Sequence, residues 1–444
     1  DISVNTTWTA ANVYSLAGQI FVVKGATLTI EPGTVIRGNI DPASKSALVI
    51  SRGSKIIAQG TASNPIVFTS GKAAGSREPG DWGGLVLLGK GIYNTNGGFN
   101  NVEGFAPTSS TDYRMKFGAD ASLGEVADNT DNSGTLKYVR IEFGGVLLSA
   151  NNEINGLTFG AVGSGTTIDY VQCSFINDDS FEWFGGAVNC KHLVAYRGID
   201  DDFDTDNGYS GKVQFGIVLR DSTIADISRS EAFESDNDAS GSINSPQTKA
   251  VFSNLTLIGP RATLANNGNS LYLAAAHVRR NTGISIYNSV ILGWPAGVLI
   301  DARNGRAVES NILDSTIRFK NNIIAGCGPA IAGGTDASYN FIASTANASL
   351  WNADSVKARF SNTVFSNKVL ANVSDAKMIA PFSYSAPDFL PFGGSNGNQD
   401  ILVGASFTDP ALTSGFNVVK FRGACDAAGV DAFWWKGWTR FNNN

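Results

Sequence analysis

The feature of this sequence that most constrains its fold is a repeat of fixed period. Three segments are alike in placing an Asn before a short apolar stretch and a Gly: SNLTLIG at 253–259, YNSVILG at 287–293 and KNNIIAG at 320–326. Asn254, Asn288 and Asn322 are each 34 residues apart. A coil of this length cannot bury its own inner face, so coils must stack on one another. The repeat therefore predicts an all-β fold, a parallel solenoid.

The recurring Asn has a structural reason of its own. Asn tolerates the left-handed backbone that tight turns need, and its amide can hydrogen-bond to the next coil. We therefore expect an Asn ladder along one corner, with Asn189 in a comparable position of an earlier coil. The competing all-β folds fit less well, because no propeller-blade signature is found and a sandwich would not repeat one residue type at constant period.

The repeat also suggests how the chain is divided. Strand-like segments run through 1–339, interrupted by an inserted loop at 91–134 that is rich in Asn, Gly, Ser and Thr. The period is lost in 340–444, which we expect to form irregular C-terminal coils and a cap packed on the same solenoid. A cap is needed because an open last coil exposes unpaired strand edges.

Charge and composition narrow the partners and the location. Only 16% of the residues are charged, the formal net charge is −6, and no basic run is present, so a nucleic-acid partner is not expected. No apolar stretch is long enough to span a membrane. The sequence starts at Asp1 rather than Met, which favours an exported chain whose leader has been removed, with a lipid anchor on a lost N-terminal Cys left open.

The net acidity is concentrated in one segment. Residues 178–238 contain 14 carboxylates and five basic residues, so this segment carries −9 and the remainder of the chain +3. Three strand-like stretches within it align, FEWFGG from Phe181, FDTDNG from Phe203 and FESDND from Phe233. The alternation of a strand places these three Phe side chains in the core. The outward positions then form two rows, Glu182, Asp204 and Glu234 in one and Phe184, Asp206 and Asp236 in the next.

Carboxylates stacked in a row require a partner. Neighbouring strands lie about 4.8 Å apart, so the row must bind a hard cation, share protons or hydrogen-bond into turns. Calcium suits a segment rich in carboxylate, Asn and turn carbonyl oxygens. The predicted calcium ligands are Asp204, Asp206, Glu234 and Asp236, with Asp200, Asp201, Asp202 and Asn237 as turn donors. The simpler alternative is that these residues only cap turns and solvate a surface.

Several segments together resemble a known group of proteins. GATLTIEPGTVIRG at 25–38, GDWGGLVLLG at 80–89, NDDSFEWFGG at 177–186 and GWTRF at 437–441 are similar to exported, surface-associated right-handed parallel β-helix proteins of Gram-negative bacteria. The resemblance implies the right-handed, pectate-lyase-like superhelix and a secreted or outer-surface location. It implies no reaction, because this fold carries many activities. In such a chain a disulfide between Cys327 on the last regular coil and Cys425 in the cap would staple the two, although four buried free thiols are the alternative.

Three functions remain open at this stage. The leading hypothesis is a non-catalytic protein whose calcium-stabilised acidic face binds an extracellular polysaccharide or a surface protein, with Glu182, Phe184 and Tyr209 contacting the ligand. The second is a carbohydrate-active enzyme, a polysaccharide lyase or a glycoside hydrolase, in which Asp204 and Glu234 act as acid and base or His277 and Arg279 supply the basic group. The simpler alternative for the latter is that Arg279 and Arg280 only balance nearby acids and that His277 is a hydrogen-bonded structural residue. The third is self-assembly through exposed strand edges.

Overall fold

The chain folds into two units, each built mainly from parallel strands. Unit 1 comprises Asp1–Gly211, Asn244–Pro246 and Trp435–Asn444, and unit 2 comprises Lys212–Ile243 and Gln247–Trp434. The expected boundary at 339/340 lies outside the described residues. The structure is a computed structural model, and it describes residues 1–39, 45–95, 97–105, 108–109, 112–149, 152–266, 268–301, 304–306, 308–328, 341–344 and 353–442.

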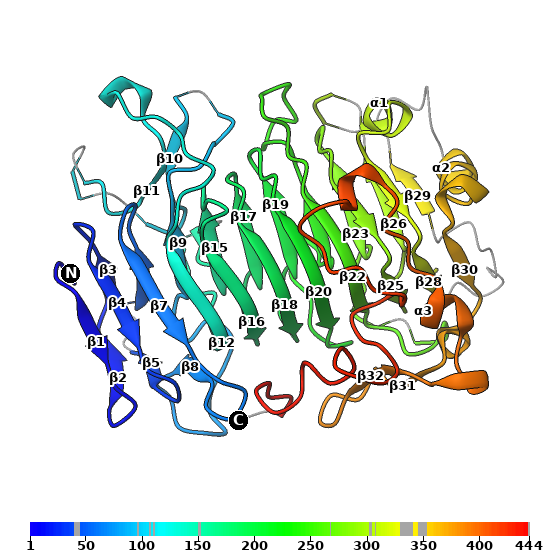
Figure 1. Ribbon diagram of the computed structural model, residues 1–444, viewed down its shortest axis with the longest axis horizontal. Helices are drawn as coiled ribbons and strands as arrows, with labels where there is room; N and C mark the ends of the chain where they lie inside the picture. The colour runs from blue at the N-terminus through cyan, green and yellow to red at the C-terminus, as the bar shows by residue number, and fades with distance from the viewer. Residues whose placement is uncertain are drawn as a thin grey trace. The chain divides into compact units, whose positions relative to one another are not determined.

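Unit 1 contains two parallel sheets. The first has the order β3 (Gln19–Val22), β6 (Ala47–Ile50), β9 (Leu85–Leu88), β15 (Leu157–Gly160), β17 (Phe181–Phe184) and β19 (Phe203–Asp206). The second has the order β1 (Thr6–Trp8), β4 (Thr27–Ile30), β7 (Lys55–Gln59), β12 (Gly134–Glu142), β16 (Thr167–Ser174) and β18 (Asn189–Tyr196), with β2 (Val13–Leu16), β5 (Val35–Gly38) and β8 (Ile66–Ser70) joined to it through β12. Successive strands lie side by side along each sheet (Figure 1).

Unit 2 repeats this arrangement. One sheet contains β21 (Phe233–Ser235), β23 (Ala276–Arg279), β26 (Val298–Asp301) and β29 (Phe341–Ser344). The other contains β20 (Lys212–Leu219), β22 (Val251–Ile258), β25 (Val290–Leu292), β28 (Ile323–Ala325) and β30 (Lys368–Leu370), with β24 (Ser285–Tyr287) and β27 (Arg318–Lys320) joined to β22. The right-handed parallel β-helix predicted from the repeats and the resemblance is therefore confirmed.

The remaining elements are short. The helices are α1 (Val308–Leu313), α2 (Ala353–Phe360) and α3 (Gln399–Val403), and the 3-10 helices are η1 (Ala121–Leu123), η3 (Thr363–Phe365), η4 (Val373–Ala376), η5 (Gly394–Asn396) and η6 (Pro410–Leu412). Antiparallel pairs are β10 (Phe99–Asn101) with β11 (Lys116–Gly118), β13 (Leu147–Ser149) with β14 (Asn152–Glu153), and β31 (Met378–Ala380) with β32 (Asp388–Pro391). No helix in the described part of the chain is long and apolar enough to cross a membrane.

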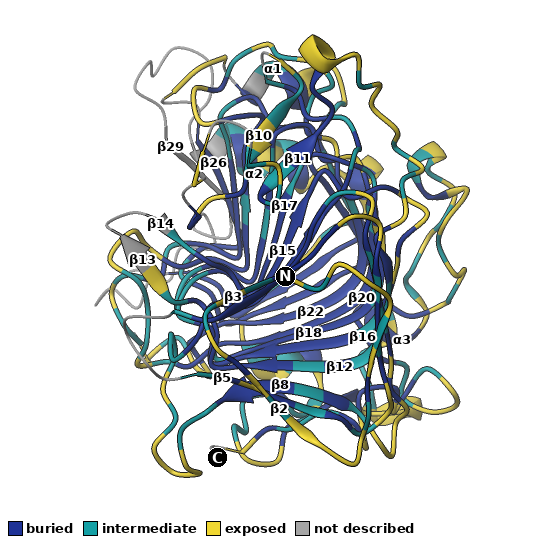
Figure 2. Cartoon of the chain, turned by 90° about the vertical axis from the view of Figure 1, so that its left-hand side faces the viewer, coloured by how far each residue is buried: buried dark blue, intermediate teal, exposed yellow. Residues whose placement is uncertain are grey.

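The interior of each unit is filled as the alternation of the strands predicts. In unit 1, Phe181 and Phe203 are fully buried and their rings stack 5.8 Å apart, with Trp183 beside them. In unit 2, Phe233 is fully buried and packs edge-to-face on Phe252 at 4.7 Å. Figure 2 shows the strands as mostly buried and the exposed residues gathered in the loops. The outward positions of the same strands are therefore the ones that remain for chemistry.

The expected Asn ladder is present in unit 2, with one change of member. Asn254, Asn288 and Asn321 all have left-handed backbone, with φ of 59°, 50° and 64°. The Asn321 amide donates to Asn288 Oδ1 at 2.6 Å, and Asn288 donates to the Ser253 hydroxyl at 3.1 Å. The predicted Asn322 is wrong as a ladder member because the last coil is one residue shorter, and its Oδ1 instead accepts from the backbone of Ser289.

In unit 1 aromatic residues occupy the corner that Asn residues occupy in unit 2. The left-handed residues there are Tyr138, Tyr170 and His192, whose rings stack at 4.4 and 4.2 Å. Trp438, from the C-terminal segment of unit 1, packs edge-on against both tyrosines. The expectation for Asn189 is therefore wrong, because Asn189 is the exposed first residue of β18 and His192 takes the corner of that coil.

The inserted loop covers part of the outward face of unit 1. Tyr93, Phe105 and Phe117 from the insertion belong to one buried apolar cluster with Val86 and Leu88 of β9. This cluster keeps water from the outward face of the early coils. The acidic strands β17 and β19 follow in the same sheet, so their carboxyl groups begin where this apolar cover ends.

The C-terminal segment lies along a corner in each unit. In unit 2, Asn254 donates to the Phe421 carbonyl and Asn321 to that of Gly404, at 2.8 and 2.7 Å. In unit 1, Gln172 exchanges hydrogen bonds with the backbone of Arg440.

The cysteines form no cross-link in the structure. All four are buried and free. The predicted staple between Cys327 and Cys425 is therefore not formed, and both behave as small buried side chains.

Candidate functional site

The first candidate site is a group of carboxyl residues on the outward face of unit 1. Parallel pairing sets Phe181 opposite Phe203, so Glu182 lies opposite Asp204 as the aligned sequences predicted. Asp179 joins this pair, with donor oxygens of Asp179, Glu182 and Asp204 all within 4.8 Å of one another. Asp179 also meets Asp178 and Asp200 at the same spacing. Glu103 of the inserted loop lies close by, since the Asn155 amide donates to both Glu103 and Glu182. We call Glu103, Asp178, Asp179, Glu182, Asp200 and Asp204 the carboxyl cluster.

Two members of the carboxyl cluster are buried without any opposite charge. Asp179 is 7% exposed and Glu182 is 6% exposed. Within the described ranges, neither carboxyl group forms an ion pair with Lys, Arg or His. Their contacts are neutral, since Asp179 Oδ1 accepts from the Asp201 backbone at 2.9 Å and Glu182 accepts from the Asn155 amide. Buried charges are ordinarily paired or bound to a metal, so this pair is unusual.

Electrostatics at the cluster oppose full ionisation. Burial, followed by the charges of Asp178 and Asp204, raises the pKa of Asp179 well above its usual range. Burial and the charge of Glu103 do the same to the pKa of Glu182. Glu103 is an exposed residue of the inserted loop, yet protein around its carboxyl group raises its pKa as well. Without a cation, the cluster must therefore retain protons near neutral pH.

Asn155 connects the two glutamates of the cluster. Its amide nitrogen donates to Glu182 and, at 3.3 Å, to Glu103. Asn155 is 1% exposed, and its own amide oxygen has no hydrogen-bond partner in the described structure. The cluster thus contains one neutral oxygen donor besides its carboxylates.

Other residues predicted as calcium ligands lie in the turn between β18 and β19 or, in the case of Asp206, at the end of β19. Asp201 and Asp202 are buried, and their carbonyls accept from the backbone of Ser180 and Phe181. Asp206 Oδ1 accepts from the backbone of Asn207 at 2.6 Å. Asp200 is half-buried at the edge of the carboxyl cluster. The backbone of this turn therefore holds the carboxyl groups in place.

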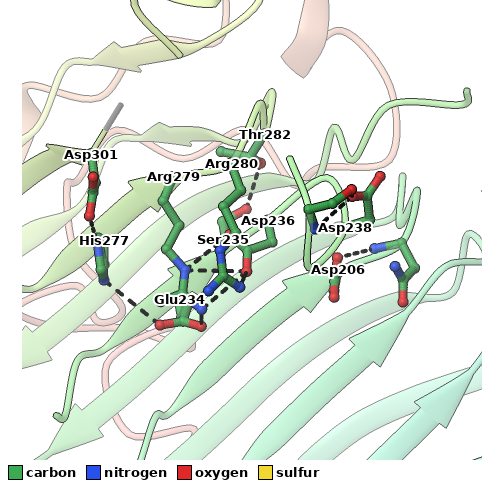
Figure 3. Close-up of polar contacts among 12 residues, drawn as sticks. Asp206, Glu234, Ser235, Asp236, Asp238, His277, Arg279, Arg280, Thr282 and Asp301 are labelled. Carbon is green, nitrogen blue, oxygen red and sulfur yellow. Dashed lines mark hydrogen bonds and ion pairs between the residues drawn. The ribbon is translucent and has the colours of Figure 1, made fainter. Parts of the chain in front are cut away.

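The second candidate site lies in unit 2 and is centred on His277. Strand pairing places Glu234 of β21 opposite His277 of β23. His277 is 3% exposed, and its Nδ1 lies 3.2 Å from Glu231 Oε1 and 3.7 Å from Glu234 Oε2. Its Nε2 lies 3.1 Å from Asp301 Oδ2 (Figure 3). An imidazole ringed by carboxylates in this way favours its charged form.

The pKa of His277 reflects these neighbours. Burial alone would lower the pKa, but the hydrogen bonds and charges of Asp301 and Glu231 raise it to about 9. At neutral pH the ring is an imidazolium, which can donate a proton but cannot accept one. His277 therefore fits the role of an acid or a fixed cation, not that of a base.

The other predicted ligands of unit 2 already have partners within the protein: arginines form ion pairs with Glu234 and Asp236, and loop residues hydrogen-bond to Asn237. The Arg279 guanidinium contacts both Glu234 and Asp236, the latter at 3.0 Å, and Arg280 reaches Asp236 at 2.8 Å (Figure 3). Asn237 is buried, donates to the Ser242 carbonyl and accepts from the Thr248 backbone. Asp236 is therefore already neutralised, and Asn237 fixes a loop. We call Glu231, Glu234, Asp236, His277, Arg279 and Asp301 the His277 network.

A cavity of about 320 Å³ adjoins the network. Arg279, Arg280, Asp301 and Asn304 line it. The Glu234 side chain is 18% exposed, more than Glu231 or Asp301. Glu234 is thus the carboxylate of the network most open to a ligand. Its predicted acid–base partner Asp204 belongs to unit 1.

Two aromatic residues predicted to contact a ligand are placed differently. Tyr209 is fully buried, its ring stacks on Trp183 and its hydroxyl donates to the Val188 carbonyl at 2.9 Å, so the prediction of an exposed Tyr209 is wrong. Phe184 does point outward, but it packs on Phe117 of the inserted loop, 6.0 Å between ring centroids. Neither ring lies open as a platform for a sugar.

Sequence reasoning missed several residues of both sites. Asp179, Glu231 and Asp301 precede or follow the aligned strands, where alternation gives no assignment. Glu103 and Asn155 come from outside the acidic segment altogether. A signal existed only for Asp179 and Glu231, which lie within the segment of high negative charge.

Comparison with known proteins agrees with the fold. A family model described as a pectate-lyase like beta helix domain matches residues 1–373. No curated protein and no solved structure matches the chain significantly. The family match includes both candidate sites, but a shared fold assigns them no chemistry.

Proposed function

The chain belongs to the pectate-lyase-like β-helix family, and we propose that its carboxyl cluster binds calcium and through it holds an acidic extracellular polymer. Secretion or display on the outer cell surface is part of this proposal. The observation that carries it is the pair Asp179 and Glu182, two buried carboxyl groups with no cationic side chain bound to them among the described residues.

Calcium suits the donor set of the cluster. It takes six to eight oxygen ligands, which carboxylates, amide oxygens and water supply. Asp179, Glu182 and Asp204 are close enough together to share one ion. The unpartnered oxygen of Asn155 is a neutral donor of the kind that calcium accepts. A bound divalent cation would offset the mutual repulsion of these carboxylates and displace the protons they retain.

The cluster is open on one side, which favours a binding function. Asp178, Asp200 and Asp204 are only half-buried, whereas Asp179 and Glu182 are buried. A calcium ion bound by Asp179 and Glu182 on its protein side could therefore complete its coordination on the solvent side with a carboxylate of a polymer. A purely acidic surface would otherwise repel such a polymer.

Calcium titration by isothermal calorimetry tests the first part of the proposal. The intact protein is expected to bind calcium saturably, and Asp179→Asn to weaken binding at least tenfold. Asp314→Asn, at an exposed carboxylate of unit 2 outside both sites, is the matched control and should bind as the intact protein does. Equal affinity for all three proteins, or no binding, would overturn the calcium site.

Polymer binding is tested separately. An acidic polysaccharide such as alginate should be retained by the immobilised protein in calcium and released by chelator, whereas neutral dextran should not be retained. Retention of alginate that is unchanged in chelator would contradict a calcium-mediated contact.

The His277 network supports a second candidate, a carbohydrate-active enzyme. The specific observation is that Glu234, the most exposed carboxylate of the network, lies between the His277 imidazolium and Arg279, and that Arg279 lines a cavity. Turnover of a panel of acidic and neutral polysaccharides is the test. Activity that is abolished by Glu234→Gln, and kept by Asp314→Asn, would establish this candidate.

A further inference from the structure

Unit 2 contains a second cavity, distinct from the His277 network, where the C-terminal segment crosses the Asn corner. Its volume is about 270 Å³, slightly below the usual range for pockets that take drug-sized ligands. Three parts of unit 2 contribute its walls, namely the corner with Tyr287 and Lys320, the turn with Phe365, and the C-terminal segment with Thr408 and Asp409. None of these residues belongs to either site described above.

The walls of this cavity are held rigidly. Asn288 donates to the Ser406 carbonyl and accepts from the Ser406 backbone, at 3.0 and 2.9 Å. Asp409 accepts from Arg318 at 2.5 Å and from Lys320 at 2.8 Å. The C-terminal wall is thus tied to the corner by amide hydrogen bonds on one side and by ion pairs on the other. The cavity is therefore formed before any ligand enters.

Tyr287 is the unexplained group in this cavity. It is 1% exposed, and its hydroxyl has no hydrogen-bond partner in the described structure. Asp409 and Arg318 are near enough to influence its pKa, but neither meets the hydroxyl in hydrogen-bonding geometry. Burial, followed by the charge of Asp409, raises the pKa of Tyr287, so the hydroxyl stays protonated and is a donor. Buried donors without partners are rare in proteins.

The charges around the cavity favour an anion. Arg318 and Lys320 supply two positive charges against the single carboxylate of Asp409. Burial alone would raise the pKa of Asp409, but the hydrogen bonds of Lys320 and Ala411 and the charge of Arg318 lower it, so it stays ionised. Hydroxyl groups of the lining add further donors, whereas the only carboxylate is already engaged by two cations. The ring of Phe365 supplies an apolar surface beside them.

We propose that this cavity binds a small organic anion, whose carboxylate or phosphate group meets the Tyr287 hydroxyl and the Lys320 ammonium while its body packs on Phe365. The ligand supplies the hydrogen-bond acceptor that Tyr287 lacks and balances the excess positive charge of Arg318 and Lys320 over Asp409. This site lies in unit 2 and needs no calcium, so it does not depend on the function proposed for the carboxyl cluster.

Isothermal calorimetry at low ionic strength tests the site, with sodium gluconate and inorganic phosphate as probes and glucose as the neutral probe. The intact protein is expected to bind at least one of the two anions at a single site. Tyr287→Phe removes only the hydroxyl and should weaken this binding about tenfold, the effect of a hydrogen bond to a charged group. Binding of phosphate but not gluconate would assign the site to phosphate groups, and the reverse to carboxylates.

Two controls keep the outcome clear. Tyr14→Phe removes a hydroxyl in unit 1 that accepts from the Thr9 backbone, and should leave anion binding unchanged. Asp179→Asn should also leave it unchanged, which separates this site from the carboxyl cluster. Absence of anion binding by the intact protein, equal binding by Tyr287→Phe, or binding of glucose as tight as that of gluconate would overturn the proposal. An unaltered melting temperature for Tyr287→Phe shows that the fold is intact.

Discussion

Glu182 on β17 and Asp204 on β19 occupy the same register position on neighbouring parallel strands of unit 1. Such positions lie about 4.8 Å apart, close enough that two ionised carboxylates repel strongly at a partly buried site. Asp179 adds a third carboxyl group to the pair. The first two predictions follow from this arrangement.

The first prediction concerns stability in the absence of calcium. The raised pKa values of Asp179 and Glu182 mean that the folded protein binds more protons than the unfolded chain above about pH 4, the usual carboxyl value. Their contribution to stability should therefore be fully present below about pH 4 and be lost as pH rises through the raised values. Asp179→Asn should raise the free energy of unfolding at pH 8 by on the order of 1 kcal/mol, because the amide keeps the Asp201 contact without the charge. Melting curves in chelator at pH 4.5 and 8 measure this, and a variant less stable at pH 8 would contradict it.

The second prediction concerns proton release. Calcium must displace the protons that the carboxyl cluster retains, so its affinity should increase as pH rises through the raised pKa values of Asp179 and Glu182. Calorimetry in two buffers of different ionisation enthalpy gives the number of protons released. A value of zero at pH 7 would mean that the cluster is fully ionised before calcium arrives.

The third prediction concerns His277, one of two histidines in the chain. Its pKa of about 9 exceeds the usual value near 6.5, so its contribution to stability is fully present below pH 6.5 and is lost as pH rises through 9. Side-chain NMR should show one histidine titrating near 9, and that signal should be missing in His277→Gln. The stability loss of this variant should be larger at pH 6 than at pH 9.5. The absence of a histidine signal that titrates near 9 would refute the arrangement with Asp301 and Glu231.

The fourth prediction concerns the Asn corner of unit 2. Asn288 is fully buried, has left-handed backbone and bonds to Ser253, Asn321 and Ser406. Asn288→Gly and Asn288→Ala both lose these hydrogen bonds, but only Ala is strained by φ of 50°. The Gly variant should therefore be the more stable of the two, by about 1 kcal/mol. Thermal unfolding decides the order, and an Ala variant as stable as Gly would exclude backbone strain.

The fifth prediction concerns the aromatic corner of unit 1. Trp438 is fully buried against Tyr138 and Tyr170. Trp438→Ala should cost about 3–5 kcal/mol of stability, as deletion of a buried aromatic side chain does. Val430→Ala, at a residue that is 92% exposed, is the control and should change stability little. Equal melting temperatures for both variants would show that the C-terminal segment is not docked.

The fold could be predicted because the residues that recur with the period of the coils are residues that the turns require. Asn254 and Asn288 repeat because few other residues adopt left-handed backbone while bonding to the next coil. The same rule failed in unit 1, where Tyr138, Tyr170 and His192 take the corner by ring stacking. Stacking compensates for backbone strain without any sequence signature of a turn. Asn322 was misassigned because a coil one residue shorter shifts the register.

The site was predicted only where strand alternation applied. Phe181, Glu182, Phe203 and Asp204 alternate along paired strands, so their faces and their pairing followed from the sequence. Asp236 was expected beside a metal, but Arg279 of β23, the strand paired with β21, and Arg280 just after it form ion pairs with its carboxylate. Glu103 arrives from the inserted loop. The Glu103 contact depends on how this loop folds over the sheet, which periodicity does not encode.

The C-terminal residues that cover the aromatic corner of unit 1 are translated long after the strands they cover. Roughly 240 residues separate His192 from the segment that begins at Trp435. Because protein synthesis adds about 5–20 residues per second, the stacked rings remain without this covering segment for about 10 to 50 s. During this interval the nascent chain exposes the aggregation-prone aromatic surface of Tyr138, Tyr170 and His192, as does any product truncated before Trp438. Docking of Trp438 therefore closes this corner, and we expect chaperones and proteases to distinguish chains whose aromatic residues are covered from chains whose aromatic residues are exposed.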